Sequence, residues 1–264
     1  MATNRITQTL ELLKGRGHKA LIGYLTAGDP DMATSERHMR TALENGVDIL
    51  ELGVPFSDPT ADGPIIQAAG QRALRAGATL HQILELAGRL RQSFTAPMVL
   101  FSYANPLLAY GYDKVCAAAA AAGLDGLLVV DMPLEEAAEL RPHLQRHGLL
   151  HIQLVAPTTP PARAQAILAQ AAGFVYYISV KGVTGTRADL AADLGAHIAE
   201  LRQYTAQPIA VGFGISNGSQ ARAAAAHADA VVVGSALVRA AQEDRLADLV
   251  RELAAALRGP TAAD

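Results

Sequence analysis

The chain has 264 residues, close to the ~250 that a complete eight-stranded α/β barrel needs. Half of its residues are hydrophobic, which suffices for a sizeable core, but no apolar run reaches the ~18 residues that span a membrane. The net charge is −3 and the charges are interspersed, so we expect no nucleic-acid partner. With one cysteine and no secretory signal in the sequence, we expect a cytoplasmic protein.

The first segment predicts a helix that precedes the rest of the fold. Ile6, Leu10 and Leu13 stand at helical spacing, and Gly15 and Gly17 end the pattern. We therefore expect one amphipathic helix ahead of the first strand.

Eight short apolar runs follow, several of them rich in valine and isoleucine. Because they are continuously apolar rather than alternating, they are typical of parallel strands covered on both faces. The runs are Ala20–Leu25, Val47–Leu52, Met98–Ser102, Gly126–Val130, Leu149–Val155, Phe174–Ser179, Ile209–Phe213 and Ala230–Val233.

Amphipathic segments rich in alanine and leucine lie between these runs. Examples are Met32–Asn45, Leu80–Phe94, Asp113–Ala122, Glu135–His147 and Pro161–Ala171. Strand and helix alternating eight times predict a (β/α)8 TIM barrel forming one domain over residues 1–264. A doubly wound open sheet is the rival fold, but it favours a glycine-rich turn after the first strand. The turn Thr26–Pro30 lacks that pattern. Cys116 precedes six alanines and is interpreted as a buried helix residue, not a nucleophile.

Catalytic groups of such barrels lie at the carboxyl ends of the strands. Alternation places Val47, Ile49 and Glu51 on one face of the second strand, with Glu51 one step from its end. An apolar barrel mouth raises the pKa of a carboxyl group, which suits proton transfer near neutral pH. A solvated residue of the mouth is an equally good interpretation of Glu51 from its position alone.

The loop that follows, Gly53–Pro64, is stiffened by three prolines and adds two acids, Asp58 and Asp62. A lone aspartate in such a loop is more often a turn cap. Two carboxylates at one mouth, Glu51 and Asp62, favour acid–base chemistry instead.

Glycines at the ends of the seventh and eighth strands predict a phosphate site. They occur in Gly212–Ser216 and Gly234–Ala236, where backbone N–H groups can approach an anion beside a helix N-terminus. The loop after the sixth strand, with Gly182 and Gly185, has the glycine hinges of a lid. An ordinary glycine-containing connection is the alternative there.

No metal or redox site is indicated. His143 and His147 share a helix face, but no acidic or cysteine ligand accompanies them on it, so they are interpreted as surface histidines.

Several motifs, in order along nearly the whole chain, resemble the tryptophan synthase alpha chain family. The most specific is the second strand with its loop. The motifs are Tyr24–Pro30, Leu50–Pro59, Ala61–Pro64, Tyr103–Asn105, Gly182–Gly185, Gly212–Ser216 and Gly234–Ala236. Lys181 departs from the family pattern, and Tyr24 stands where phenylalanine is frequent.

This resemblance implies a lyase that reversibly cleaves indole-3-glycerol phosphate to indole and glyceraldehyde 3-phosphate. It implies Glu51 as general acid–base and Asp62 as the acceptor of the indole N–H. Tyr176 would lie near the reacting centre, while Tyr24, Phe101 and Leu128 would line the indole pocket. The phosphate would bind at Gly185, Gly214, Gly234 and Ser235.

The resemblance also implies a partner, a tryptophan synthase β subunit that carries pyridoxal phosphate, in an α2β2 heterotetramer. No cofactor is expected in this chain.

Two other functions remain open. Another phosphate-binding barrel, such as an isomerase of amino-acid biosynthesis, would explain the glycines but not the Glu51–Asp62 pair. A regulatory barrel that only binds a β-type partner would be expected to have lost one of those acids.

Overall fold

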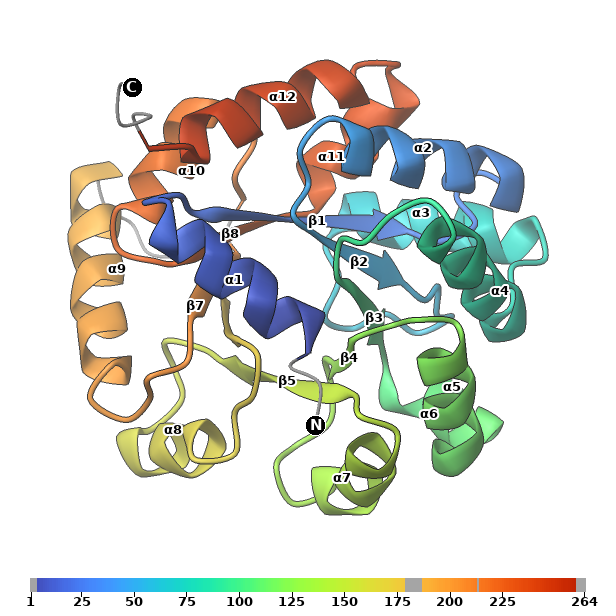
Figure 1. The fold of residues 1–264 in the computed structure, drawn as a ribbon, viewed down its shortest axis with the longest axis horizontal. Coiled ribbons are helices and arrows are strands. Elements are labelled where there is room, and N and C mark those ends of the chain that lie inside the picture. Colours follow the sequence, from blue (N-terminus) through green and yellow to red (C-terminus); the bar gives the residue numbers. More distant parts are fainter. Residues whose placement is uncertain (1–3, 179–186, 213, 260–264) are drawn as a thin grey trace.

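The eight predicted strands form a closed parallel barrel in which each strand pairs with its neighbours in chain order (Figure 1). The computed structural model describes residues 4–178, 187–212 and 214–259. Because the sheet closes into a barrel, the predicted (β/α)8 fold is confirmed and the rival open, doubly wound fold is excluded. The strands are β1 (Ala20–Thr26), β2 (Ile49–Gly53), β3 (Met98–Ser102), β4 (Gly126–Val129), β5 (Leu150–Val155), β6 (Val175–Ile178), β7 (Ile209–Gly212) and β8 (Ala230–Val233).

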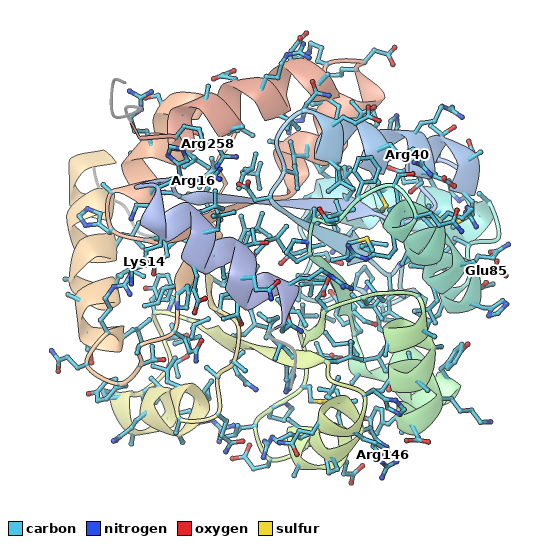
Figure 2. The ribbon with its side chains drawn as sticks, in the orientation of Figure 1. Lys14, Arg16, Arg40, Glu85, Arg146 and Arg258 are labelled. Carbon is cyan, nitrogen blue, oxygen red and sulfur yellow. The ribbon has the colours of Figure 1, made fainter. Side chains whose placement is uncertain are left out.

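Helices surround the barrel, and charged side chains such as Glu85 and Arg146 point outward from this ring (Figure 2). No helix of the described segments is long and apolar enough to cross a membrane. The helices are α1 (Arg5–Gly15), α2 (Met32–Glu44), α3 (Pro64–Arg75), α4 (Leu80–Arg91), α5 (Ala104–Tyr110), α6 (Tyr112–Ala121), α7 (Ala137–Arg146), α8 (Pro161–Leu168), α9 (Arg187–Leu201), α10 (Gly218–Ala225), α11 (Ser235–Gln242) and α12 (Leu246–Leu257). Cys116 is fully buried in α6, as predicted.

Two apolar layers fill the fold, one between barrel and helices and one inside the barrel. Ile49 and Leu128 belong to the inner layer, which α1 closes from the amino-terminal end of the strands. The prediction that Val47 shares a face of β2 with Ile49 and Glu51 is wrong, because Val47 packs in the outer layer. The strand begins only at Ile49, so strict alternation does not extend back to Val47.

Ile6 shows how closely α1 fits the end of the barrel. A Cβ atom added to Gly173 or Gly126 would lie 3.3 or 3.4 Å from the Ile6 side chain. Both glycines therefore leave room for this residue, which is completely buried. The leading helix that the sequence predicts thus forms the floor of the barrel.

An aspartate stands directly before β2, β4 and β8, and each of these aspartates binds the strand that precedes its own. In each case the carboxylate accepts the backbone N–H at the start of the preceding strand. These bonds run from Leu21 N to Asp48 Oδ2 (2.8 Å), from Met98 N to Asp125 Oδ2 (2.9 Å) and from Ile209 N to Asp229 Oδ2 (2.9 Å). Each aspartate also pairs with arginine, through Arg258, through Arg5 and Arg91, or through Arg202.

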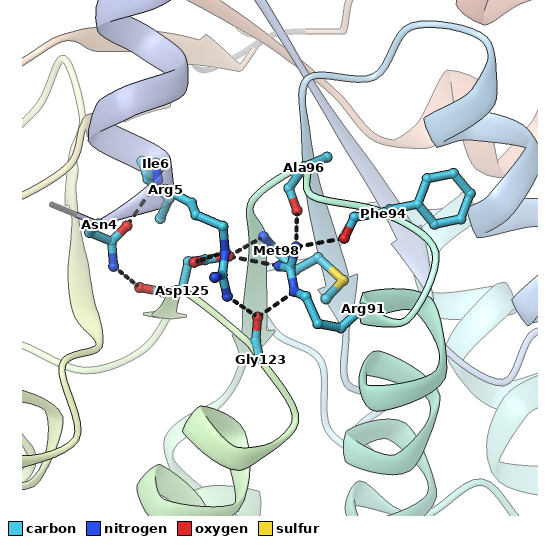
Figure 3. Close-up of polar contacts among 9 residues, drawn as sticks. All are labelled: Asn4, Arg5, Ile6, Arg91, Phe94, Ala96, Met98, Gly123 and Asp125. Atoms are coloured by element: carbon cyan, nitrogen blue, oxygen red, sulfur yellow. Dashed lines mark hydrogen bonds and ion pairs between the residues drawn. The ribbon is translucent and has the colours of Figure 1, made fainter. Parts of the chain in front are cut away.

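The Asp125 cluster is the densest of the three (Figure 3). The Asp125 side chain is 4% exposed, and its oxygens lie 2.9 Å from Arg5 Nε and 3.0 Å from Arg91 Nη2. Asn4 donates to the Asp125 carbonyl at 2.9 Å, and its own side-chain oxygen caps α1 at Ile6 N. One buried carboxylate therefore joins α1, α4, β3 and β4.

We expect Asp125→Asn to lower the free energy of unfolding by about 3 kcal/mol, because it leaves two guanidinium groups without their buried counter-charge. Urea denaturation measures this loss. Asp248→Asn is the matched control, since Asp248 forms an exposed pair with Arg251 and should change stability by less than about 1 kcal/mol. Equal losses in the two variants would contradict the role given to the Asp125 cluster.

Candidate active site

Glu51 lies inside the barrel near the carboxyl end of β2, level with Tyr24 of β1 and Val99 of β3. It is completely buried, and neither carboxyl oxygen has a hydrogen-bond partner within the described segments. Burial disfavours the charged form and raises the pKa of Glu51 from 4.5 to about 8. Glu51 is therefore a protonated acid at neutral pH.

Tyr24 and Tyr176 lie close to Glu51, each beside a glycine of the next strand. A Cβ atom on Gly53 would lie 2.2 Å from the Tyr24 hydroxyl, and one on Gly212 would lie 2.5 Å from the Tyr176 hydroxyl. Only glycine leaves room for these rings. Burial raises the pKa of both tyrosines, and the charge of Asp62 raises the pKa of Tyr24 further. Both phenols keep their protons and remain hydrogen-bond donors.

Phe101 and Leu128 add an apolar wall on the adjoining strands. The Tyr24 and Phe101 rings meet edge to face, with centroids 5.0 Å apart. Leu128 pairs with Phe101 in the strand register and is completely buried in the inner layer. The three residues that the resemblance assigns to an indole pocket are thus brought together.

Asp62 sits in the loop between β2 and α3, less buried than Glu51. Its backbone N–H donates to Pro59 O at 3.1 Å, and Gln67 Nε2 donates to its carbonyl at 2.9 Å. Burial raises the pKa of Asp62 to about 6, against a lowering by a hydrogen bond from Tyr103. Asp62 is therefore ionised at neutral pH, beside a Glu51 that is not.

Tyr103 is a member of this site that sequence reasoning missed. Its hydroxyl accepts the Ala61 N–H at 3.0 Å and hydrogen-bonds to Asp62, so it holds both the loop backbone and the carboxylate. Phe56 packs on it, with ring centroids 5.0 Å apart. The sequence offered two signals, its place directly after β3 and its membership of the motif Tyr103–Asn105, but neither assigned it a role. Asp58, by contrast, is exposed and bonds to Ser57, which agrees with a turn residue.

A cavity of about 600 Å³ opens beside these residues, over the ends of β6, β7 and β8. Tyr176, Gly214, Gly234 and Ser235 line it. Gly214 has a φ of +41°, a conformation that favours glycine. The predicted phosphate-site member Gly185 lies outside the described residues, and so do Lys181 and Gly182 of the predicted lid.

The N-terminus of α11 faces this cavity without a side-chain cap. In neighbouring α10 the Asn217 side chain caps Gln220 N at 3.0 Å. The first N–H groups of α11 are thus left to an anion in the cavity, with the helix dipole in its favour. The arrangement agrees with the phosphate site predicted at Gly234 and Ser235.

The interpretation of His143 and His147 needs one correction. Both are half-buried, and an acid does accompany them: Asp113 Oδ1 lies 3.0 Å from His143 Nδ1 and 3.5 Å from His147 Nε2. Asp113 comes from α6, which packs beside α7, so the helix face alone could not reveal it. Within the described segments no group of three histidine, cysteine or acidic residues can hold a metal ion.

Known proteins are similar to this chain over nearly its whole length. The sequence model of the "Tryptophan synthase alpha chain" family matches residues 10–260. The alpha chain of Geobacter sulfurreducens is 48% identical over 251 residues, covering 95% of both chains. That of Chromobacterium violaceum is 50% identical over 250 residues, covering 92% of this chain and 95% of the relative.

Solved structures agree with these relatives. Tryptophan synthase from M. tuberculosis, in an open form with BRD0059 bound, has a chain 35% identical to this one. It superposes with a TM-score of 0.91 and covers 97% of this chain and 100% of its own. The alpha subunit from Legionella pneumophila is 36% identical with a TM-score of 0.89, covering 97% and 99%.

The closed barrel, with acids and a cavity at the carboxyl ends of its strands, places the chain in the class of (β/α)8 barrel enzymes. Similarity to these relatives identifies the family within that class. The chain belongs to the tryptophan synthase alpha chain family.

We expect Glu51→Gln to make the protein more stable, increasingly so from pH 4.5 to pH 8. In this range the parent carboxyl stays protonated when folded but ionises when unfolded, which favours unfolding of the parent alone. Urea denaturation at several pH values gives the difference in free energy of unfolding. A difference that does not change with pH would show that the pKa of Glu51 is ordinary.

Proposed function

We propose that Glu51 and Asp62 carry out the reversible cleavage of indole-3-glycerol phosphate to indole and glyceraldehyde 3-phosphate. This lyase reaction is the alpha-subunit half-reaction of tryptophan biosynthesis, the activity of the family to which the chain belongs. The observation that carries the assignment is the contrast between the two acids. Glu51 is buried and protonated, whereas Asp62 is ionised in the loop at the same mouth.

Indole leaves poorly as an anion, so carbon 3 of the ring must first be protonated. The Glu51 carboxyl gives its proton to that carbon, and the ring nitrogen becomes positive. Asp62 accepts the N–H and stabilises this charge. The Glu51 carboxylate then takes the proton of the hydroxyl on the carbon beside the ring. The bond between that carbon and the ring breaks, its electrons return to the ring, and Glu51 ends protonated as it began.

The other site residues bind and orient the substrate in this proposal. Tyr24, Phe101 and Leu128 would hold the indole ring, and the Tyr176 hydroxyl would lie near the reacting centre. Gly214, Gly234 and Ser235 would bind the phosphate through backbone N–H groups at the cavity, joined by Gly185 of the strand-six loop.

We propose a tryptophan synthase β subunit as the partner, in keeping with the similarity of this chain to a chain in the solved structures of M. tuberculosis tryptophan synthase. We propose that this β subunit holds pyridoxal phosphate and receives the indole. The chain itself would act as one barrel domain in the cytoplasm, inside an α2β2 assembly.

We expect kcat/KM for cleavage to be bell-shaped in pH. Activity should fall below about pH 6, where Asp62 takes up a proton, and above about pH 8, where Glu51 loses its own. Initial rates between pH 5 and pH 9.5 test this. In Asp62→Asn the acid limb should disappear while the alkaline limb remains. An acid limb that persists in that variant would assign it to another group.

We expect Glu51→Gln to reduce cleavage of indole-3-glycerol phosphate at least ~10²-fold, because the general acid–base is lost. It should still bind glycerol 3-phosphate, since that contact lies elsewhere in the cavity. Asp62→Asn should lose activity through weaker stabilisation of the ring charge. Asp58→Asn, in the same loop but exposed, is the matched control and should retain activity.

Two outcomes would count against the proposal. Near-normal cleavage by Glu51→Gln together with loss in Asp62→Asn would reverse the two roles. Normal cleavage by both variants would place the active site elsewhere.

A further inference from the structure

The cavity over β6–β8 contains a charged side chain that the proposed phosphate contacts do not include. Its described lining is apolar or uncharged except for Arg239 of α11. Arg239 stands four residues after Ser235, so the two share a face of the helix. Because helical side chains lean toward the N-terminus, Arg239 extends back toward Ser235 and the uncapped end of α11.

Arg239 is available for a ligand. Its side chain forms no hydrogen bond or ion pair with any described residue, whereas Arg72, Arg91 and Arg258 are each paired with an aspartate. The nearest acids of α12, which line an adjoining cavity with Arg239, are already engaged. Glu252 accepts Gly218 N at 2.7 Å, and Asp248 pairs with Arg251.

The negative charge of a phosphate ligand favours a cationic side chain in this cavity. A phosphate monoester carries close to two negative charges at neutral pH, whereas a helix N-terminus offers only about half a positive charge. The same mouth also contains the negative Asp62. Backbone N–H groups alone therefore leave most of the phosphate charge unbalanced.

We propose that Arg239 is the cationic side chain of the phosphate subsite and sets its selectivity for phosphorylated over unphosphorylated ligands. This inference rests on the proposed function. The guanidinium and the first N–H groups of α11 both donate hydrogen bonds to the phosphate oxygens. Arg239 does not take part in the proton transfers.

The test compares Arg239→Gln with Arg239→Lys, and with Arg75→Gln as a matched control that removes an exposed, unpaired arginine outside the cavity. The dissociation constant of glycerol 3-phosphate should rise about tenfold in Arg239→Gln, the usual size of one charge-assisted contact. KM for indole-3-glycerol phosphate should rise equally, with kcat within about twofold. Arg239→Lys should recover most of the affinity, and indole binding should not change in any variant.

Unchanged glycerol 3-phosphate binding in Arg239→Gln would overturn the inference, as would an equal loss in Arg75→Gln. A parallel loss of indole binding that Arg239→Lys does not restore would also overturn it, by showing damage to the barrel mouth. If the parent enzyme fails to cleave indole-3-glycerol phosphate, the proposed function fails. If the parent cleaves normally and only the Arg239 variants disagree, this inference alone fails.

Discussion

A carboxyl group buried without a partner is the constraint around which this structure is arranged. Glu51 is in the inner layer of a closed barrel, and neither of its oxygens has a hydrogen-bond partner in the described segments. Such a group is tolerated only in its neutral form, since an unpaired buried charge costs several kcal/mol. Any feature that admitted water or a cation to Glu51 would lower its pKa. Tyr24, Phe101 and the floor built by α1 therefore serve the chemistry as well as the packing.

The two acids of the mouth differ because their elements differ. A strand fixes Glu51 among apolar side chains, whereas a loop leaves Asp62 near solvent with Tyr103 as a donor. Their environments raise one pKa to about 8 and the other to about 6. At neutral pH a proton donor and a negative charge thus coexist in one site. Burial alone thus gives two carboxyl groups of one site different charges at the same pH.

Sequence patterns predicted the repeated strand–helix units of this protein. Apolar runs located all eight strands to within about two residues, because strands covered on both faces are apolar throughout. The errors arise where a partner is distant in the chain. The Asp113 contact with His143 spans 30 residues, and the Tyr103 contact with Ala61 spans 42. Arg239 was missed for a different reason, since a lone arginine on a helix carries no signal until the cavity beside it is known.

The buried carboxyl groups at the two ends of the barrel have opposite environments. At the amino-terminal end, Asp48, Asp125 and Asp229 each lie between an arginine and a backbone N–H, and these contacts fix one strand to the next. At the carboxyl end, Glu51 has no hydrogen-bond partner among the described residues and stays neutral. At β6 the position before the strand is filled by the buried Phe174 instead of an aspartate. The ionic anchors therefore hold three of the four strand pairs, and they sit away from the mouth, where a fixed positive charge would ionise Glu51 and remove its proton before the substrate arrives.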